Sequence, residues 1–556
     1  MAERLWAGLD RVLQRHAAER AEKTALVVLG RDGDESERLS FAELDRRARA
    51  VAAAILDVGA RGAPVLILEP SSARFAAAFW GCVHAGAIAV PAPVNTRGQG
   101  LQRLIAIARD AQVAALVSSS RILQDVAAPE LDHIPRILAD ELDPGAVLEA
   151  PTPARSEDPV LLQYTSGSVG EPKGVIVTAA ALSANLQMVC DAMGLDDEAV
   201  VFSWLPLFHD MGLIGAMLGA AFAGRPCILS TPLFFMQKPE RWLKGMSRYR
   251  ATYSGAPNFA YEICARRAGR MDLEGVDLSS WRTAFCGAEP VQAATLRRFA
   301  QAFEPCGFRP SAWRPCYGLA EASLIVSGGP RGGLRTRPAD RPEGAPVVSC
   351  GAPAEGLQVR IVGPDRAPLG DGGEGEVWVA GPSVGAGYWR RPRETAETFG
   401  ARLADGEGPF LRTGDLGVMS DGELFITGRI KDLIIHRGAN LHPADLEQAI
   451  AACDPALLPA AAAFQLDGGE IVAVQEVEAP LDAARCAEIV QAALLAVGER
   501  FGLRLHDVRL VRRRAIPVTT SGKVRRQACR ALYLCGALPP LANAAAQASL
   551  GEDREL

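Results

Sequence analysis

The sequence predicts an α/β fold with a different C-terminal part, on three observations. Short apolar runs alternate with amphipathic stretches up to about residue 350, which is typical of largely parallel strands joined by helices. Closely spaced strand-like runs then follow on either side of a Gly-rich turn. After about residue 430 the pattern is mixed again, which predicts a separate small α+β domain.

Each element is expected from its local pattern. Strands are predicted in the first part over residues 25–30, 64–69, 114–119, 226–230 and 283–287, and helices over 41–56 and 182–189. Residues 357–363 and 375–381 predict strands of an antiparallel, barrel-like unit. The last part predicts a helix over 443–452, a strand over 471–477, a helix over 483–498 and a frayed Ala-rich tail over 542–556. Residues 328–346, rich in Gly, Pro and Arg, predict an exposed connection.

Composition excludes several classes of protein. The 556 residues carry 59 basic and 65 acidic side chains, a net charge of −6, and 49% of them are hydrophobic. This composition is typical of a globular protein, and the negative net charge does not indicate nucleic-acid binding. The apolar stretch 211–224 is shorter than the roughly 20 residues of a membrane span. The N-terminus lacks the pattern of a signal peptide, and the 12 cysteines form no CxxC pair. We therefore expect a cytoplasmic protein with reduced thiols.

One segment has the composition of a phosphate-binding loop. An apolar strand over 161–164 runs into a hydroxyl- and glycine-rich turn that ends in a lysine. Small residues let backbone N–H groups approach phosphate oxygens, hydroxyls add donors and the lysine adds positive charge. It is not the common NTPase loop, because Lys173 is followed by glycine. The alternative is a flexible surface turn; the candidate residues are Thr165, Ser166, Gly167, Ser168, Gly170 and Lys173.

The string YTSGSVGEPKGV (164–175) resembles the signature loop of the adenylate-forming superfamily, which includes acyl-CoA synthetases, peptide-synthetase adenylation domains and luciferases. YGLAE (317–321), RTGD (412–415), GRIKD (428–432) and TSGK (520–523) follow in the family's order. The resemblance implies a large N-terminal region, 1–430, made of two α/β subdomains and a β-rich, barrel-like subdomain at about 350–428. It also implies a small mobile C-terminal domain, 431–556, with its hinge at Lys431.

The family's reaction brings two anions together, because a carboxylate attacks the α-phosphorus of ATP and expels pyrophosphate. The resemblance implies ATP and Mg²⁺ as cofactors, with Glu321 and Thr165 at the metal. It also implies nucleotide contacts from these residues: Gly287, Ala288, Glu289, Tyr317 and Gly318 beside the base, Asp415 at the ribose, and Arg429 near the ribose or phosphate. Lys523 matches the family's catalytic lysine, which bridges the attacking carboxylate and the α-phosphate.

Each of these residues, taken singly, has an ordinary alternative. Tyr317 could be a core aromatic, Glu321 a helix cap and Asp415 a turn former. Lys431 could be an exposed turn lysine, and Lys523 part of a solvated basic face. The five motifs in combination favour the functional interpretation.

A further set of segments resembles the fatty acyl-AMP ligases within this superfamily: HDMGLIG (209–215), YSGAPNFAY (253–261), CGAEP (286–290) and DLIIHRGAN (432–440). The resemblance implies a catalytic site role for His209 at the mouth of the acyl and nucleotide sites, although a satisfied core histidine is the alternative. Gly212, Gly215 and Gly219 could leave room for a long acyl chain or serve core packing.

We therefore expect an enzyme that converts a fatty acid to its acyl-adenylate with ATP and transfers the acyl group to the phosphopantetheine thiol of a separate acyl carrier protein. Members of the branch carry an extra segment after YGLAE, and the short stretch 328–346 departs from this pattern. Coenzyme A thus stays an alternative acceptor, and a catalytically silent adenylate-binding protein is a third hypothesis. Five arginines could meet an acidic carrier or form a solvated surface: Arg512, Arg513, Arg514, Arg525 and Arg526.

Overall fold

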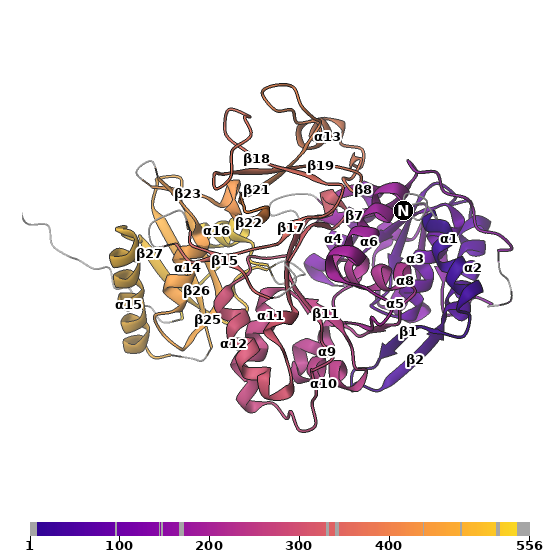
Figure 1. The fold of residues 1–556 in the computed structure, drawn as a ribbon, viewed down its shortest axis with the longest axis horizontal. Coiled ribbons are helices and arrows are strands. Elements are labelled where there is room, and N and C mark those ends of the chain that lie inside the picture. The colour runs from indigo at the N-terminus through magenta and orange to yellow at the C-terminus, as the bar shows by residue number, and fades with distance from the viewer. Residues whose placement is uncertain are drawn as a thin grey trace, which may run out of the picture. The chain divides into compact units, whose positions relative to one another are not determined.

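The computed structural model describes residues 8–94, 97–143, 145, 148–165, 172–329, 333–339, 344–436, 439–478, 481–518 and 523–541. Its contacts divide the chain into two compact units (Figure 1). Unit 1 comprises residues 1–337 and 347–426, and unit 2 comprises residues 338–346 and 427–556. The expected tail at 542–556 lies outside the described residues.

Unit 1 contains a nine-stranded sheet that is parallel in its centre. Its strands are, in spatial order, β17 (Ala352–Pro353), β14 (Ile325–Gly328), β13 (Trp313–Gly318), β12 (Thr283–Cys286), β11 (Tyr253–Ala256), β9 (Val201–Ser203), β10 (Cys227–Leu229), β1 (Thr24–Leu29) and β2 (Glu35–Ser40). The six strands from β13 to β1 run parallel, while β2, β14 and β17 are antiparallel additions.

A seven-stranded sheet in unit 1 carries the loop that the sequence singled out. Its order is β20 (Gly387–Tyr388), β8 (Lys173–Thr178), β7 (Pro159–Thr165), β4 (Ile88–Pro91), β3 (Pro64–Leu68), β5 (Ala115–Ser118) and β6 (Arg136–Leu138). All five residues of β3 are buried, as expected for a parallel strand covered on both faces. The predicted α/β fold and the five strands predicted in this part are confirmed.

Helices connect and cover these sheets. Those of unit 1 are α1 (Leu9–Glu19), α2 (Phe41–Asp57), α3 (Ala73–Ala85), α4 (Gly98–Ala111), α5 (Ser120–Asp125), α6 (Ala179–Met193), α7 (Asp210–Gly212), α8 (Gly219–Ala223), α9 (Pro232–Gln237), α10 (Glu240–Arg248), α11 (Asn258–Arg267), α12 (Ala293–Phe303) and α13 (Pro392–Phe399). Helices α11 and α12 pack side by side (Figure 1). Helix α2 begins at a capping box, in which Ser40 and Glu43 each accept a hydrogen bond from the other's backbone N–H.

The two strands predicted after residue 350 are β18 (Gln358–Val362) and β19 (Glu374–Ala380), which pair antiparallel. They belong to a four-stranded sheet with the order β18, β19, β21 (Leu411–Ser420) and β22 (Glu423–Arg429). The connection predicted over 328–346 contains more structure than expected. Two residues, Thr336–Arg337 (β15), pair with Val347–Val348 (β16). A strand of two residues has no hydrophobic period, so the sequence pattern did not indicate it.

Unit 2 has a small α+β core. Strand β26 (Ile471–Val477) pairs antiparallel with β25 (Leu457–Gln465) and parallel with β27 (Asp507–Arg512). The other elements are the hairpin β23 (Ile434–His436) and β24 (Ala439–Leu441), and the helices α14 (Pro443–Ala451), α15 (Ala483–Phe501) and α16 (Arg526–Leu534). The predicted helices over 443–452 and 483–498 and the strand over 471–477 are confirmed. Among the described residues, no helix has the length and hydropathy of a membrane span.

Candidate active site

The candidate phosphate loop lies at the end of the β7–β8 hairpin. Thr165 is the last residue of β7 and pairs with Lys173, the first residue of β8. The Arg103 guanidinium donates a hydrogen bond to the Thr165 carbonyl over 3.0 Å. Four predicted loop residues lie outside the described part of the chain: Ser166, Gly167, Ser168 and Gly170. The hairpin therefore holds both described ends of the loop, Thr165 and Lys173, next to each other.

A distant segment brings an aromatic side chain to this hairpin. Strand β20 pairs antiparallel with β8, and Tyr388 lies opposite Val175. The Lys173 ammonium lies 5.3 Å from the centre of the Tyr388 ring, and the Tyr388 hydroxyl donates to Glu321 over 2.9 Å. Burial, together with the Glu321 carboxylate, raises the pKa of Tyr388 above its usual value, so this hydroxyl stays a donor. Tyr388 thereby connects the loop lysine with the glutamate of the YGLAE motif.

Lys173 also forms an ion pair with Glu394, in the first turn of α13. The hydrogen bond from Lys173 is the main reason why the pKa of Glu394 lies below its usual value. Arg391 contacts Glu394 at 3.3 Å and Asp110 at 3.0 Å. Asp110 in turn accepts a 2.6 Å hydrogen bond from the Tyr164 hydroxyl. A network of charged and polar side chains thus extends from Lys173, at one described end of the loop.

The two motif residues assigned to the nucleoside are joined directly. The Tyr317 hydroxyl donates to the Asp415 carboxylate over 2.7 Å, and both side chains are buried. The backbone N–H of Asp415 donates to the Thr413 hydroxyl within the RTGD segment of β21, where the pairing with β19 is irregular. Gly318 has no room for a side chain, because a Cβ there would lie 1.9 Å from the Leu324 carbonyl oxygen. Tyr317, near the end of β13, and Asp415, within β21, therefore bring two different sheets together at one buried hydrogen bond.

The turn 287–289 follows β12 in the nine-stranded sheet. A Cβ at Gly287 would lie 2.9 Å from the Cys316 sulfur, so the turn packs tightly against the strand that leads into Tyr317. Ala288 has a φ of +65°, in the left-handed region. The Glu289 carboxylate accepts a 2.6 Å hydrogen bond from the backbone N–H of Phe259, at the start of α11. This contact gives Glu289 a capping role at a helix N-terminus.

The residue before His209 contacts β7, the strand that leads into the candidate phosphate loop. The Gln163 side chain, on β7, donates to the Phe208 carbonyl over 2.9 Å. His209 is the N-cap residue of α7, and its Nδ1 lies 2.7 Å from the Asp210 carboxylate. A π-helical segment, Leu213–Leu218, follows, a feature often found at functional sites. The histidine is partly exposed, so it is not a buried core residue.

The glycines after His209 are explained by packing. A Cβ at Gly212 would lie 2.4 Å from the Pro206 carbonyl oxygen, and one at Gly215 would lie 3.1 Å from Leu324. A Cβ at Gly219 would lie 3.2 Å from the Ile214 carbonyl oxygen. Each missing side chain therefore allows a close approach of neighbouring atoms, which favours the packing explanation over an open tunnel at these three positions.

Unit 2 holds the remaining predicted residues. Arg429 precedes the 3₁₀ turn Ile430–Asp432, which contains Lys431. Lys523 lies just before α16, next to the bridge between Val518 and Val524. The Gln527 side chain contacts the Lys431 carbonyl at 3.4 Å. The predicted hinge residue and the segment that carries the predicted catalytic lysine are thus held together within this unit.

Comparison with known proteins decides the family. The model of the AMP-binding enzyme family matches residues 13–389, which is more than half of the chain. The chain belongs to the AMP-binding enzyme family. The resemblance to adenylate-forming enzymes and the expected fold are confirmed.

Relatives match over nearly the whole of this AMP-binding enzyme. It is 38% identical over 563 residues to a medium-chain-fatty-acid–[acyl-carrier-protein] ligase of Moorena producens, with 95% of each chain covered. It is 36% identical over 571 residues to a 4-hydroxyphenylalkanoate adenylyltransferase of Mycobacterium tuberculosis, with 95% and 92% covered. A crystal structure of a fatty acyl-adenylate ligase from L. pneumophila, in complex with acyl adenylate and pyrophosphate, has a TM-score of 0.74 and 35% identity, with 96% and 97% covered.

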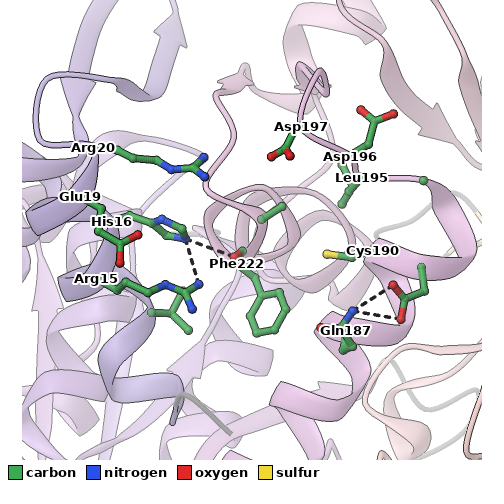
Figure 2. Close-up of a pocket in the computed structure, with 14 residues that line it drawn as sticks. Arg15, His16, Glu19, Arg20, Gln187, Cys190, Leu195, Asp196, Asp197 and Phe222 are labelled. Atoms are coloured by element: carbon green, nitrogen blue, oxygen red, sulfur yellow. Dashed lines mark hydrogen bonds between the residues drawn. The ribbon is translucent and has the colours of Figure 1, made fainter. Parts of the chain in front are cut away.

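A separate pocket of this AMP-binding enzyme, about 730 Å³ in volume, lies between α1, α6 and α8 (Figure 2). Arg15 and Arg20 lie on one side, and Asp196 and Asp197 lie on the other. The Nε2 of buried His16, which also lines the pocket, donates to the Phe222 carbonyl over 3.3 Å. None of the residues predicted for adenylation lines this pocket. We therefore assign it no part in the candidate site.

Sequence reasoning missed three residues around Lys173: Tyr388, Arg391 and Glu394. They follow Lys173 by more than 200 positions and belong to none of the five motifs. One local signal was present, because Pro392 and Glu394 occupy the first turn of a helix, where proline and acidic residues are favoured. That signal predicts a helix start but does not indicate which lysine the helix meets.

Proposed function

We propose that this AMP-binding enzyme activates a fatty or related carboxylic acid with ATP, releases pyrophosphate, and transfers the acyl group to the phosphopantetheine thiol of a separate acyl carrier protein. The observation that carries the proposal is the near-full-length similarity to a relative named as a medium-chain-fatty-acid–[acyl-carrier-protein] ligase. The related ligase that was crystallised with acyl adenylate and pyrophosphate supports the first half of the reaction.

The charges around the described site suit the binding of ATP. A carboxylate and a triphosphate repel each other, so catalysis requires cations and fixed donors where negative charge gathers. Lys173 supplies an ammonium at the end of the β7–β8 hairpin. Asp415 is buried and accepts a hydrogen bond from Tyr317, and a carboxylate can accept hydrogen bonds from ribose hydroxyls. We assign phosphate binding to Lys173 and ribose binding to Asp415.

We assign Glu321 and Thr165 as the residues that would hold a magnesium ion when the nucleotide is bound. Among the described residues, no cluster of three or more His, Cys, Asp or Glu side chains forms a metal cage built by the protein alone. Mg²⁺ in nucleotide sites instead keeps one or two protein oxygens and completes its shell with phosphate and water oxygens. When bound, the ion lowers the repulsion between the two anionic reactants.

Four further residues complete the proposed reaction. His209, partly exposed at the start of α7, donates a hydrogen bond to the carboxylate of the acid substrate. Lys523 bridges this carboxylate and the α-phosphate during adenylate formation. Lys431 is the hinge about which the C-terminal domain turns between the two half-reactions. Arg429, two residues earlier, contributes to the ribose or phosphate contacts.

The acceptor is tested by mass spectrometry after incubation with ATP, a panel of fatty acids, and either coenzyme A or a holo acyl carrier protein. We expect acyl carrier protein to become acylated and acyl-CoA to form slowly or not at all. Efficient formation of acyl-CoA, without acylation of carrier protein, contradicts the proposed acceptor. Absence of pyrophosphate release with every acid contradicts the proposed activation step.

The role of Lys523 is tested by separating the two half-reactions. Lys523→Ala is expected to abolish carboxylate-dependent exchange of pyrophosphate into ATP, because the bridging ammonium is lost. It is expected to spare acyl transfer from a supplied acyl-adenylate. Lys244→Ala is a control, since the Lys244 ammonium pairs with the exposed side chain of Asp272 over 2.6 Å. Normal exchange in the Lys523 variant refutes this role.

A further inference from the structure

Glu394 competes for the lysine that the proposed function assigns to phosphate. Lys173 forms an ion pair with Glu394. Its ammonium lies above the Tyr388 ring, and Tyr388 donates to Glu321. Lys173 thus has a carboxylate partner in the protein without any nucleotide. When the ammonium turns toward polyphosphate oxygens, the negatively charged Glu394 therefore competes with them for it.

The carboxylate of Glu394 is held in place independently of Lys173. Arg391 contacts it at 3.3 Å, and the same guanidinium contacts Asp110 at 3.0 Å. The Arg391 guanidinium is also 3.5 Å from the Pro172 carbonyl oxygen. Helix α13 positions Glu394 in its first turn, so the backbone also restrains it. Glu394 thus keeps its position when Lys173 moves away, and it is available again when the lysine returns.

We propose that Glu394 is a positioning residue that holds Lys173 while the polyphosphate is absent, yields it to ATP, and takes it back as pyrophosphate leaves. This inference rests on the proposed function, because it requires that Lys173 binds the polyphosphate. The exchange favours product release, since the departing pyrophosphate is replaced by a carboxylate that is already in place. The same exchange weakens the binding of ATP and of pyrophosphate.

The test compares Glu394→Gln with Glu397→Gln. The amide keeps the shape of the glutamate and can still accept from Arg391, but it removes the negative charge that attracts Lys173. Glu397 is the control, because it lies one turn later in α13 and pairs with exposed Arg393 over 3.0 Å. The measurements are the apparent KM for ATP, the inhibition constant of pyrophosphate in adenylate formation, and the thermal unfolding midpoint.

For Glu394→Gln we expect both the KM for ATP and the inhibition constant of pyrophosphate to fall by about two- to fivefold. This range corresponds to a partly exposed ion pair. Glu397→Gln is expected to leave both constants unchanged. In a Lys173→Ala background, Glu394→Gln is expected to have no effect on either constant, because the competing partner is gone. If Glu394 had only a structural role, Glu394→Gln would lower the unfolding midpoint without tightening the binding of pyrophosphate.

The outcomes separate this inference from the proposed function. Suppose that Lys173→Ala weakens the binding of ATP and pyrophosphate, but Glu394→Gln leaves their binding unchanged or weakens it. Glu394 is then not a competing partner, and only this inference fails. If Lys173→Ala changes neither constant, the phosphate role of Lys173 fails and this inference fails with it. If Glu394→Gln binds pyrophosphate more tightly, and this effect disappears in the Lys173→Ala background, the result supports both this inference and the phosphate role of Lys173.

Discussion

Replacing Arg526 by leucine should loosen the part of unit 2 that carries Lys523. The Arg526 guanidinium donates to both oxygens of Glu447, over 2.7 and 2.6 Å, and contacts Asp432 at 3.4 Å. The three side chains are only 12–13% exposed. Burial alone would lower the pKa of Arg526, but the two carboxylates raise it above its usual value. The arginine therefore stays charged in the folded unit.

The size of the effect follows from this burial. Removing one partner of a buried ion pair leaves an uncompensated charge and typically costs about 3–5 kcal/mol. Here Arg526→Leu leaves two carboxylates without their common cation. Every tryptophan of the chain precedes residue 390, so tryptophan fluorescence does not report on unit 2. Amide hydrogen exchange of α14 and α16 does, and 3–5 kcal/mol predicts a loss of protection of roughly 150- to 5,000-fold.

Two variants make this expectation sharp. Arg530→Leu, one turn later in α16, removes a guanidinium whose acidic partner, Asp467, is 95% exposed, so it should cost about 1 kcal/mol or less. The double variant Arg526→Leu with Glu447→Gln should recover part of the protection, because it also removes a buried charge. If Arg526→Leu loses no more protection than Arg530→Leu, the buried charges do not hold α16 and the reasoning is refuted.

Two predictions concern unit 1. Burial would raise the pKa of Asp45, but hydrogen bonds from His84 and Arg49 outweigh it and hold the pKa below its usual value. The resulting stabilisation is present above the unfolded-state pKa, about 3.9, and is lost as pH falls through the lower folded-state value. As the pH falls below about 4, the thermal unfolding midpoint of the wild-type protein should therefore fall more than that of Asp45→Asn. An equal fall of the two midpoints with pH would contradict this. Ser40→Ala removes the hydroxyl that caps α2 and should cost about 1 kcal/mol, seen as faster amide exchange at the start of α2; unchanged exchange would show that the cap contributes nothing there.

Much of the fold could be predicted from the sequence because its signals are local. Buried strands such as β3 are continuous apolar runs, and α2 repeats its apolar residues at helical spacing. The candidate residues Lys173 and Asp415 lie in short motifs whose residue types suit phosphate and ribose. Such patterns need only neighbouring residues, and these are visible in a sequence.

Other features depend on contacts between distant segments. Tyr388 reaches Lys173 because a strand of two residues, β20, pairs with β8, and so short a strand has no period to reveal it. Tyr317 meets Asp415 although they lie 98 positions apart in the chain.

By itself, the sequence determined the α/β fold, the family and the candidate residues of each motif, since these follow from residue types at fixed spacing. Only the tertiary structure decided that Glu394 holds Lys173 and that Tyr388 connects this lysine with Glu321. The physical reason is that an ion pair or a hydrogen bond depends on distances of a few ångströms in space, and chain spacing does not specify these distances between elements that fold together from far apart.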